Sequence, residues 1–140
     1  MPAYILDSNV VISHLRTPLE VSALLSRWAV GDYATVSVVT RMEVLAGMHE
    51  REALRTMELL GSIPSLPVTE AIADRAGRWI YQYARRGTQL TLADALIAAT
   101  AVEHDLTLVT GNAKHFPMPE LRLECWPDLA RGGPPTCPSP

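Results

Sequence analysis

The chain has 140 residues, of which 48% are hydrophobic and 19% are charged, so it is long enough for one compact domain with its own core. Its formal net charge of −3 excludes a uniformly basic surface and confines any nucleic-acid contact to local patches. No apolar run approaches the roughly 18 to 20 residues that cross a bilayer, and the two cysteines match neither a disulfide framework nor a clustered zinc site, so we expect a cytoplasmic protein without membrane contact.

The first predicted elements are a short strand and two helices. The apolar run at 3–6 is typical of a buried strand, and it stops at residues 7–9, whose types (Asp, Ser and Asn) favour a helix start. Residues 10–15 continue as a short helix. A second helix is predicted over 18–31, because a threonine cap and a proline precede its apolar stripe and a glycine closes it.

The middle of the chain predicts a strand that leads directly into a helix. Residues 34–39 are rich in β-branched side chains, which favour a strand. Thr40 and Glu43 are spaced as a capping box, so we expect the helix to begin at Thr40 with Glu43 in its first turn. Charged residues at 49–52 predict a break. A further helical stripe of apolar side chains follows, made of Leu54, Met57, Leu59 and Leu60.

Two helices and two strands are predicted in the last part of the chain. Residues 69–87 form an amphipathic pattern with a threonine cap and a terminal glycine. Residues 91–101 also begin with a threonine cap, but they are apolar on almost every face. The runs at 106–109 and 121–126 are strand candidates, and the second is expected at a sheet edge.

Strands that alternate with helices predict βαβ units and therefore a mainly parallel sheet with helices on both faces. The predicted fold class is α/β. No repeat divides the chain, and we place the single domain at residues 1–130. Residues 131–140 are dominated by Gly, Pro, Ser and Thr, and we expect them to form a disordered tail.

One carboxylate, Asp94, interrupts the apolar helix predicted over 91–101. An aspartate inside a domain is almost never fully buried without a partner or a metal ion. A simpler interpretation is helix capping, in which Thr91 is the N-cap and the helix dipole favours an acid in the first turn. This helix alone favours neither interpretation.

Three acids are predicted in similar places: Asp7 just after a strand, Glu43 in the helix that follows a strand, and Asp94 at the start of a buried helix. In an open α/β sheet such places gather at the carboxyl ends of the strands, where ligands bind. Two like charges about 4 Å apart repel by on the order of 4 kcal/mol at an effective dielectric of about 20. A divalent cation resolves that repulsion, and oxygen ligands without His or Cys favour Mg²⁺ or Mn²⁺ over zinc.

Four short segments carry these acids and the loop after the strand at 106–109. They read Ile5-Leu6-Asp7-Ser8-Asn9, Met42-Glu43-Val44-Leu45-Ala46-Gly47, Asp94-Ala95-Leu96-Ile97-Ala98-Ala99-Thr100-Ala101, and Leu108-Val109-Thr110-Gly111-Asn112 through His115-Phe116. In this order the segments resemble those of the PIN-domain ribonucleases, specifically the VapC-type toxins of bacterial toxin–antitoxin pairs. The resemblance implies a PIN-like, Rossmann-like arrangement of the α/β fold.

The resemblance also assigns the site residues. It implies that Asp7, Glu43 and Asp94 bind the metal, and that Asn112 is the fourth catalytic residue, at a position usually acidic or Asn in the family. The chain departs from the commonest family pattern at His115, where an aspartate often precedes the phenylalanine. A second metal ion would therefore bind weakly, or only once RNA supplies phosphate oxygens.

By the same resemblance, the expected activity is endoribonucleolytic hydrolysis of RNA, transfer RNA being the suggested substrate, with Mg²⁺ as cofactor and Mn²⁺ as a substitute. The expected partners are a VapB-type antitoxin and a second copy of the chain. A non-catalytic PIN-fold module that acts through protein or RNA partners is the alternative. An aspartyl-phosphate phosphatase would need an aspartate where Asn9 stands, and a dinucleotide enzyme would need glycines after the first strand.

Several other residues have both a functional and a structural interpretation. Thr110 could position water or a ligand, but a threonine that ends a strand more often belongs to a turn. His115 could contact phosphate, but a loop histidine is more often a surface residue. Five cations could form an RNA-binding rim or simply end helices: Arg16, Arg41, Arg85, Arg86 and Lys114. Core or dimer packing is predicted for Trp28, Trp79 and Tyr83.

Overall fold

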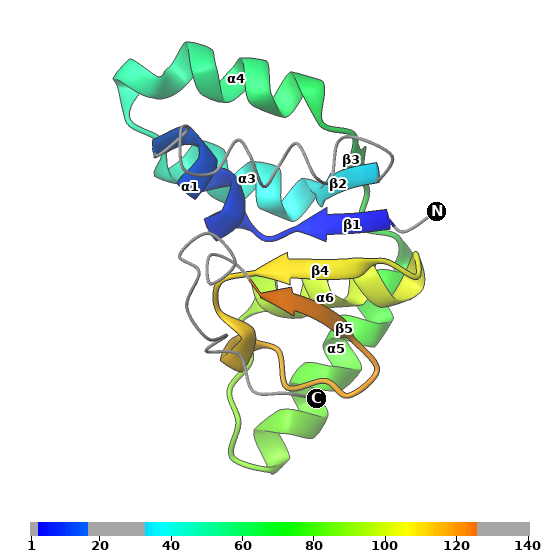
Figure 1. Ribbon diagram of the computed structural model, residues 1–140. Helices are drawn as coiled ribbons and strands as arrows, with labels where there is room; N and C mark the ends of the chain where they lie inside the picture. Colours follow the sequence, from blue (N-terminus) through cyan, green and yellow to red (C-terminus); the bar gives the residue numbers. More distant parts are fainter. Residues whose placement is uncertain (1–2, 17–32, 126–140) are drawn as a thin grey trace.

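The computed structural model of the protein describes residues 3–16 and 33–125 (Figure 1). Five strands form one sheet in the order β3-β2-β1-β4-β5, and every pairing is parallel. The strands are β1 (Ala3–Leu6), β2 (Tyr33–Ser37), β3 (Ser65–Leu66), β4 (Thr107–Thr110) and β5 (Arg122–Cys125). The helices are α1 (Ser8–Arg16), α3 (Val38–Gly47), α4 (Ala53–Ser62), α5 (Glu70–Arg85) and α6 (Leu92–Glu103), with 3₁₀ turns η1 (Glu50–Glu52) and η2 (Ala113–His115). The predicted α/β class is confirmed.

Two apolar cores cover the two faces of the sheet. Successive residues of a strand point to opposite faces, and in β1 Ile5 belongs to the core under α5 and α6, whereas Leu6 belongs to the core under α1, α3 and α4. Leu108 and Val109 of β4 divide in the same way. In Figure 1, α1, α3 and α4 accordingly gather on one side of the sheet, and α5 and α6 on the other. None of the described helices is long and apolar enough to cross a membrane.

Helix α6 is the most deeply buried helix that the structure describes, which explains its almost uniform apolar sequence. It packs between the sheet and α5, and its fully buried side chains are Ala95, Ile97, Ala98, Ala99, Thr100 and Ala101. The Thr91 hydroxyl accepts a hydrogen bond from the Asp94 backbone N–H at 3.1 Å. The capping interpretation therefore holds for the backbone of Asp94, and it leaves the carboxylate to other partners.

The predicted start of α3 is wrong. Ser37 ends β2 and caps the helix, because its hydroxyl accepts a hydrogen bond from the Val39 backbone N–H at 3.0 Å. Thr40 is inside the helix and buried, and its hydroxyl has no hydrogen-bond partner among the described residues. Glu43 therefore lies in the second turn and not in the first. Local capping by Ser37 and packing of Val39 in the core prevail over the strand preference of β-branched side chains.

The apolar stripe predicted on α4 is only partly correct. Leu60 and Thr56 are buried, but the side chains of Leu54 and Met57 are 82% and 50% exposed, because the helix packs against the core along one edge. The expected break at 49–52 is confirmed as η1. Strand β3 was not predicted, since two residues are too few to show a periodic pattern.

The predicted ends of α5 are confirmed. Thr69 caps it by accepting a hydrogen bond from the Ile72 N–H at 3.2 Å, and Gly87 follows it with a φ of 82°, which suits glycine. Trp79 and Tyr83 of α5 are core residues, as expected.

Cys125 is disulfide-bonded, which differs from the expectation. The sequence could not predict this, because the spacing of two cysteines carries too little information to exclude a single disulfide. Cys137, the predicted helix over 18–31 with Trp28, the end of the strand at 126, and the tail at 131–140 lie outside the described residues.

Candidate active site

Two loops meet at the carboxyl ends of the neighbouring strands β1 and β4. The first begins at Asp7, whose backbone N–H continues the sheet pattern by donating to the Val109 carbonyl at 2.9 Å. The second begins at Gly111, whose N–H lies 3.4 Å from the Asn9 side-chain oxygen. This is the edge at which ligands bind in open parallel sheets.

Asp7 is held in place by both loops. Its side chain is buried, with 5% of the residue exposed. Oδ1 accepts a hydrogen bond from the Ser8 backbone N–H at 2.8 Å, and Oδ2 accepts one from the Thr110 hydroxyl at 2.7 Å. The Thr110 oxygen accepts in turn from the Asn112 backbone N–H at 3.0 Å. Thr110 is therefore a positioning residue for Asp7, and not only part of a turn.

Ser8 joins the first two carboxylates. Its hydroxyl lies 2.9 Å from Glu43 Oε1 and 3.5 Å from Asp7 Oδ1, so the main hydrogen bond goes to Glu43. Glu43 projects from α3 and Ser8 opens α1, which pack against each other. This helix contact brings Glu43 to Asp7 even though Glu43 is one turn later in its helix than expected.

Asp94 and Asn112 complete the set of expected residues in different ways. The Asp94 side chain, 19% exposed, has its Oδ2 3.6 Å from His115 Nδ1, and this contact would become an ion pair on protonation of the histidine. Asn112 is exposed, and it joins the network through its backbone N–H to Thr110. Within the described part of the chain, its side-chain amide makes no hydrogen bond to any of the three acids.

The charge of Asp94 acts on the other two acids, Asp7 and Glu43. Burial raises the pKa of Asp7, the charge of Asp94 raises it further, and the hydrogen bonds from Thr110 and Ser8 act in the opposite direction. The pKa of Glu43 is raised by burial first and then by the charges of Asp7 and Asp94. Repulsion between the carboxylates therefore makes their charged forms costly to keep together.

The chemistry of these side chains fits a hard divalent cation. All three acids offer oxygen ligands, and Asp7 Oδ2 accepts one hydrogen bond, from the Thr110 hydroxyl, which leaves its other lone pair for an ion. Positive charge would also offset both the burial and the smaller carboxylate repulsion that raise the pKa of Asp7 and Glu43. As they stand, no three His, Cys, Asp or Glu side chains of the described residues are grouped closely enough to ligate one ion.

The sequence did not reveal two polar contributors to this site, Ser8 and Asn9. Ser8 directly follows Asp7 and Asn9 is the next residue, and this placement after an acid at the end of a strand is the one signal that could have identified them. One of the five candidate rim cations, Arg41, has a structural role, since its guanidinium donates to the Leu60 carbonyl at 2.9 Å.

Comparisons with known proteins give a consistent result. The family model described as PIN domain matches residues 4–118. Ribonuclease VapC10 of Mycobacterium tuberculosis is 40% identical over 114 residues, which cover 81% of this chain and 86% of that protein. The structure of DNA-bound VapBC from Salmonella typhimurium aligns with a TM-score of 0.79 and 24% identity over 91% of this chain and all of the other. A toxin–antitoxin complex from Klebsiella pneumoniae aligns at 0.70 and 29% identity over 84% and 94%.

Proposed function

The chain belongs to the PIN domain family and to its VapC ribonucleases, and from this premise we propose that it is the toxin of a toxin–antitoxin pair, an endoribonuclease that hydrolyses RNA phosphodiester bonds. We assign the metal-binding role to Asp7, Glu43 and Asp94. The observation that carries the assignment is their proximity: burial is the main cause of the raised pKa of Asp7 and of Glu43, and the charge of Asp94, on α6, raises both further. An isolated capping acid would not affect acids on other elements in this way.

A bound divalent ion would supply Lewis acidity, which makes a water molecule a better nucleophile and stabilises the negative charge that develops on the phosphate. The protein's own part is positional. Thr110 and the Ser8 backbone hold Asp7 in one orientation, and the Ser8 hydroxyl holds Glu43 beside it. The carboxylates orient the attacking water, and Asp7 and Glu43, whose pKa is raised chiefly by burial, are suited to take up its proton.

Mg²⁺ is the proposed ion and Mn²⁺ its substitute, because the ligands are carboxylate oxygens without sulfur and with His115 only at the margin of the site. Glu43 and Asp94 are partly exposed, so their side chains can rotate toward an ion that Asp7 holds from a fixed position. Asn112 supports the site from the loop after β4, where its backbone already orders Thr110.

We also propose the substrate, the protein partners, the bounds of the catalytic domain and its place of action. RNA is the substrate, with transfer RNA as the suggested class, and a small VapB-type antitoxin and a second copy of the chain are the protein partners. The antitoxin partner is supported by the toxin–antitoxin complex from Klebsiella pneumoniae, which shares the fold at 29% identity. Residues 1–130 form the catalytic domain, and its place of action is the cytoplasm, where its RNA substrates are.

The experiment is an RNA cleavage assay with purified, antitoxin-free protein. Total cellular RNA is incubated with the wild type in Mg²⁺ or Mn²⁺ and in EDTA, alongside the Asp7→Ala and Asp94→Ala variants. We expect cleavage only with the divalent ion, and a loss of at least about a hundredfold in each variant, the scale for a lost electrostatic or general-base contribution.

The control is Asp74→Ala, which removes an exposed aspartate from α5 without touching the site and should cleave like the wild type. Absence of divalent-dependent cleavage by the wild type would favour the non-catalytic binding module. Unchanged cleavage in both site variants would show that the acids are wrongly assigned.

A further inference from the structure

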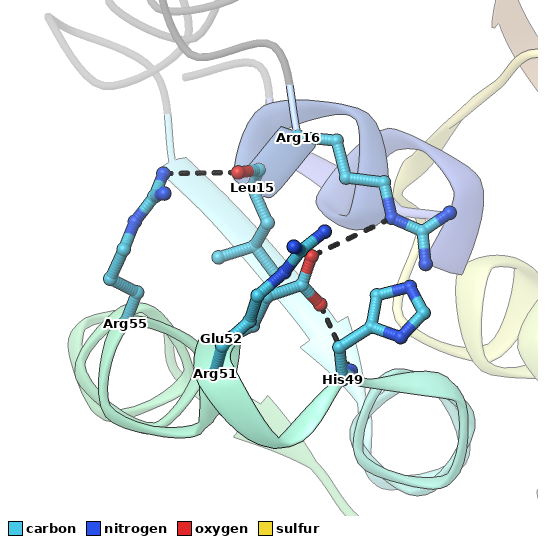
Figure 2. A pocket seen from close by; sticks show the side chains of 6 residues that line it. All are labelled: Leu15, Arg16, His49, Arg51, Glu52 and Arg55. Carbon is cyan, nitrogen blue, oxygen red and sulfur yellow. Dashed lines mark hydrogen bonds and ion pairs between the residues drawn. The ribbon is translucent and has the colours of Figure 1, made fainter.

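A second polar site lies at the far end of α1 from the acids. It is an open cleft of about 550 Å³. Its walls come from the last turn of α1, the segment after α3, η1 and the first turn of α4 (Figure 2). The six residues that line it are Leu15, Arg16, His49, Arg51, Glu52 and Arg55. Three guanidinium groups and one carboxylate make the cleft net positive, in a chain whose formal net charge is −3.

The cleft and the acids share the same two helices. Helix α1 begins at Ser8, which bridges two of the acids, and ends at Arg16, about 12 Å further along the helix axis. Helix α3 carries Glu43 and ends at Gly47, two residues before His49 of the cleft. A polymer bound at the acids can therefore continue along this helix pair into the cleft.

Contacts inside the cleft separate its fixed cations from its available ones. Arg55 is fixed, since its guanidinium donates to the Leu15 carbonyl at 3.0 Å. Glu52 accepts a hydrogen bond from the His49 backbone N–H at 3.1 Å, and its ion pair with Arg16 is long, at 3.9 Å. The Arg16 side chain is 49% exposed, so this pair is weak.

Arg51 is exposed and makes neither a hydrogen bond nor an ion pair within 3–16 and 33–125. Other arginines are engaged elsewhere: Arg75 lies 2.7 Å from Glu103, and Arg122 lies 3.0 Å from Asp105. Arg16 and Arg51 are therefore the guanidinium groups of the cleft that an incoming anion can use.

We propose that this cleft binds the phosphate backbone of RNA, with Arg16 and Arg51 as the phosphate contacts, and that the same strand places its scissile phosphate at the acids. This inference rests on the proposed function. Guanidinium groups match phosphate with paired hydrogen bonds, and an acidic catalytic site needs local cations to hold a polyanion. An acidic protein segment could meet the same cations, but a nucleic acid is favoured because the proposed function has the acids act on its phosphates.

The test is an RNA-binding titration of the full chain in EDTA, which prevents cleavage. Fluorescence anisotropy follows a labelled, structured RNA oligonucleotide at several salt concentrations. The double variant Arg16→Gln/Arg51→Gln should bind roughly tenfold more weakly, and the slope of log K against log salt should fall by about 1.4, or about 0.7 for each lost phosphate contact. Arg55 is left intact because it secures the end of α1.

Two further variants make the result specific. Arg78→Gln/Arg122→Gln removes the same charge from α5 and from the amino end of β5, and its affinity should stay within about twofold of the wild type. Glu52→Gln should bind about twofold to threefold more tightly, because the amide still accepts the His49 hydrogen bond but no longer competes for Arg16.

Three results would overturn the proposal: wild-type affinity in the cleft pair, equal losses in the cleft pair and the control pair, or weakened binding of a labelled oligoglutamate without weakened binding of RNA. Cleavage kinetics with Mn²⁺ separate this proposal from the catalytic one. The cleft pair should raise KM and leave kcat within about twofold, as for uniform binding. A wild type that binds RNA through the cleft without cleaving it would contradict the proposed function alone.

Discussion

At Asp7, burial and hydrogen bonding act in opposite directions on one carboxyl group. Burial dominates, so the folded protein holds the Asp7 proton more tightly than the unfolded chain does. Stability therefore falls as the pH rises from the unfolded pKa of 3.8 through the raised folded pKa, and the full cost remains above it. Such a cost is tolerated where a charged, poorly solvated group is needed for function.

This cost predicts the effect of Asp7→Asn on stability. In EDTA at neutral pH the variant should melt a few degrees above the wild type, because the buried charge is gone. The difference should shrink as the pH falls toward the unfolded pKa of 3.8 and should disappear below it, where Asp7 is neutral in both states. Thermal melts across this pH range measure it. The exposed-site control Asp74→Asn should show no such trend.

With a divalent ion present, the wild type should melt at a higher temperature than Asp7→Asn, the reverse of the order expected in EDTA. Millimolar Mn²⁺ should raise the wild-type melting temperature by preferential binding to the folded state, and Asp7→Asn should lose most of that rise. A wild-type melting curve that ignores Mn²⁺ would argue strongly against a metal site. If the difference in melting temperature between wild type and Asp7→Asn did not vary with pH, the buried charge of Asp7 would not be the cause of that difference.

At the level of elements, the junction between β2 and α3 decides where Glu43 points. The structure has Ser37 as the cap, buried and hydrogen-bonded to the Val39 N–H at 3.0 Å. The sequence favoured Thr40, which in fact has a buried hydroxyl without a partner among the described residues. A cap three residues earlier shifts Glu43 into the second turn, beside Ser8.

Two matched substitutions test this junction. Ser37→Ala should lower the free energy of unfolding by about 1 kcal/mol, the usual contribution of an N-cap. Thr40→Val should be neutral or slightly stabilising, since it replaces an unsatisfied buried hydroxyl with a methyl group of similar size. Urea denaturation measures both. A larger loss of unfolding free energy for Thr40→Val than for Ser37→Ala would indicate that Thr40, and not Ser37, caps the helix.

For the whole molecule, the sequence was most informative where a local run of apolar residues was enough to predict a buried strand or helix. The buried runs at 3–6 and 106–109 predicted β1 and β4, and the parallel pairing of these strands places Asp7 beside the loop that starts at Gly111. The all-apolar pattern of α6 made Asp94 conspicuous. Elements that depend on tertiary packing were not predictable in this way, as the two-residue β3 and the exposed side of α4 show.

The candidate site was predictable for its charges but not for its hydrogen bonds. Three carboxylates at the ends of strands and helices indicate a cation site even when the order of the strands in the sheet is unknown. The Ser8 bridge to Glu43, at 2.9 Å, depends on the packing of α1 against α3, which no local pattern encodes. The cleft at Arg16 and Arg51 also brings together segments far apart in the sequence, so only the folded chain reveals it.

The central claim is that acids and a divalent ion activate water to hydrolyse RNA, and the chemistry of the fragment ends tests it most directly. Total cellular RNA is cleaved by the purified protein in Mg²⁺ or Mn²⁺, and the new ends are mapped. Attack by water leaves 5′-phosphate and 3′-hydroxyl ends, because the RNA 2′-hydroxyl takes no part; these are the ends we predict. A histidine-based route through the 2′-hydroxyl would leave 2′,3′-cyclic phosphates, and finding those ends, or cleavage that survives EDTA, would contradict the account.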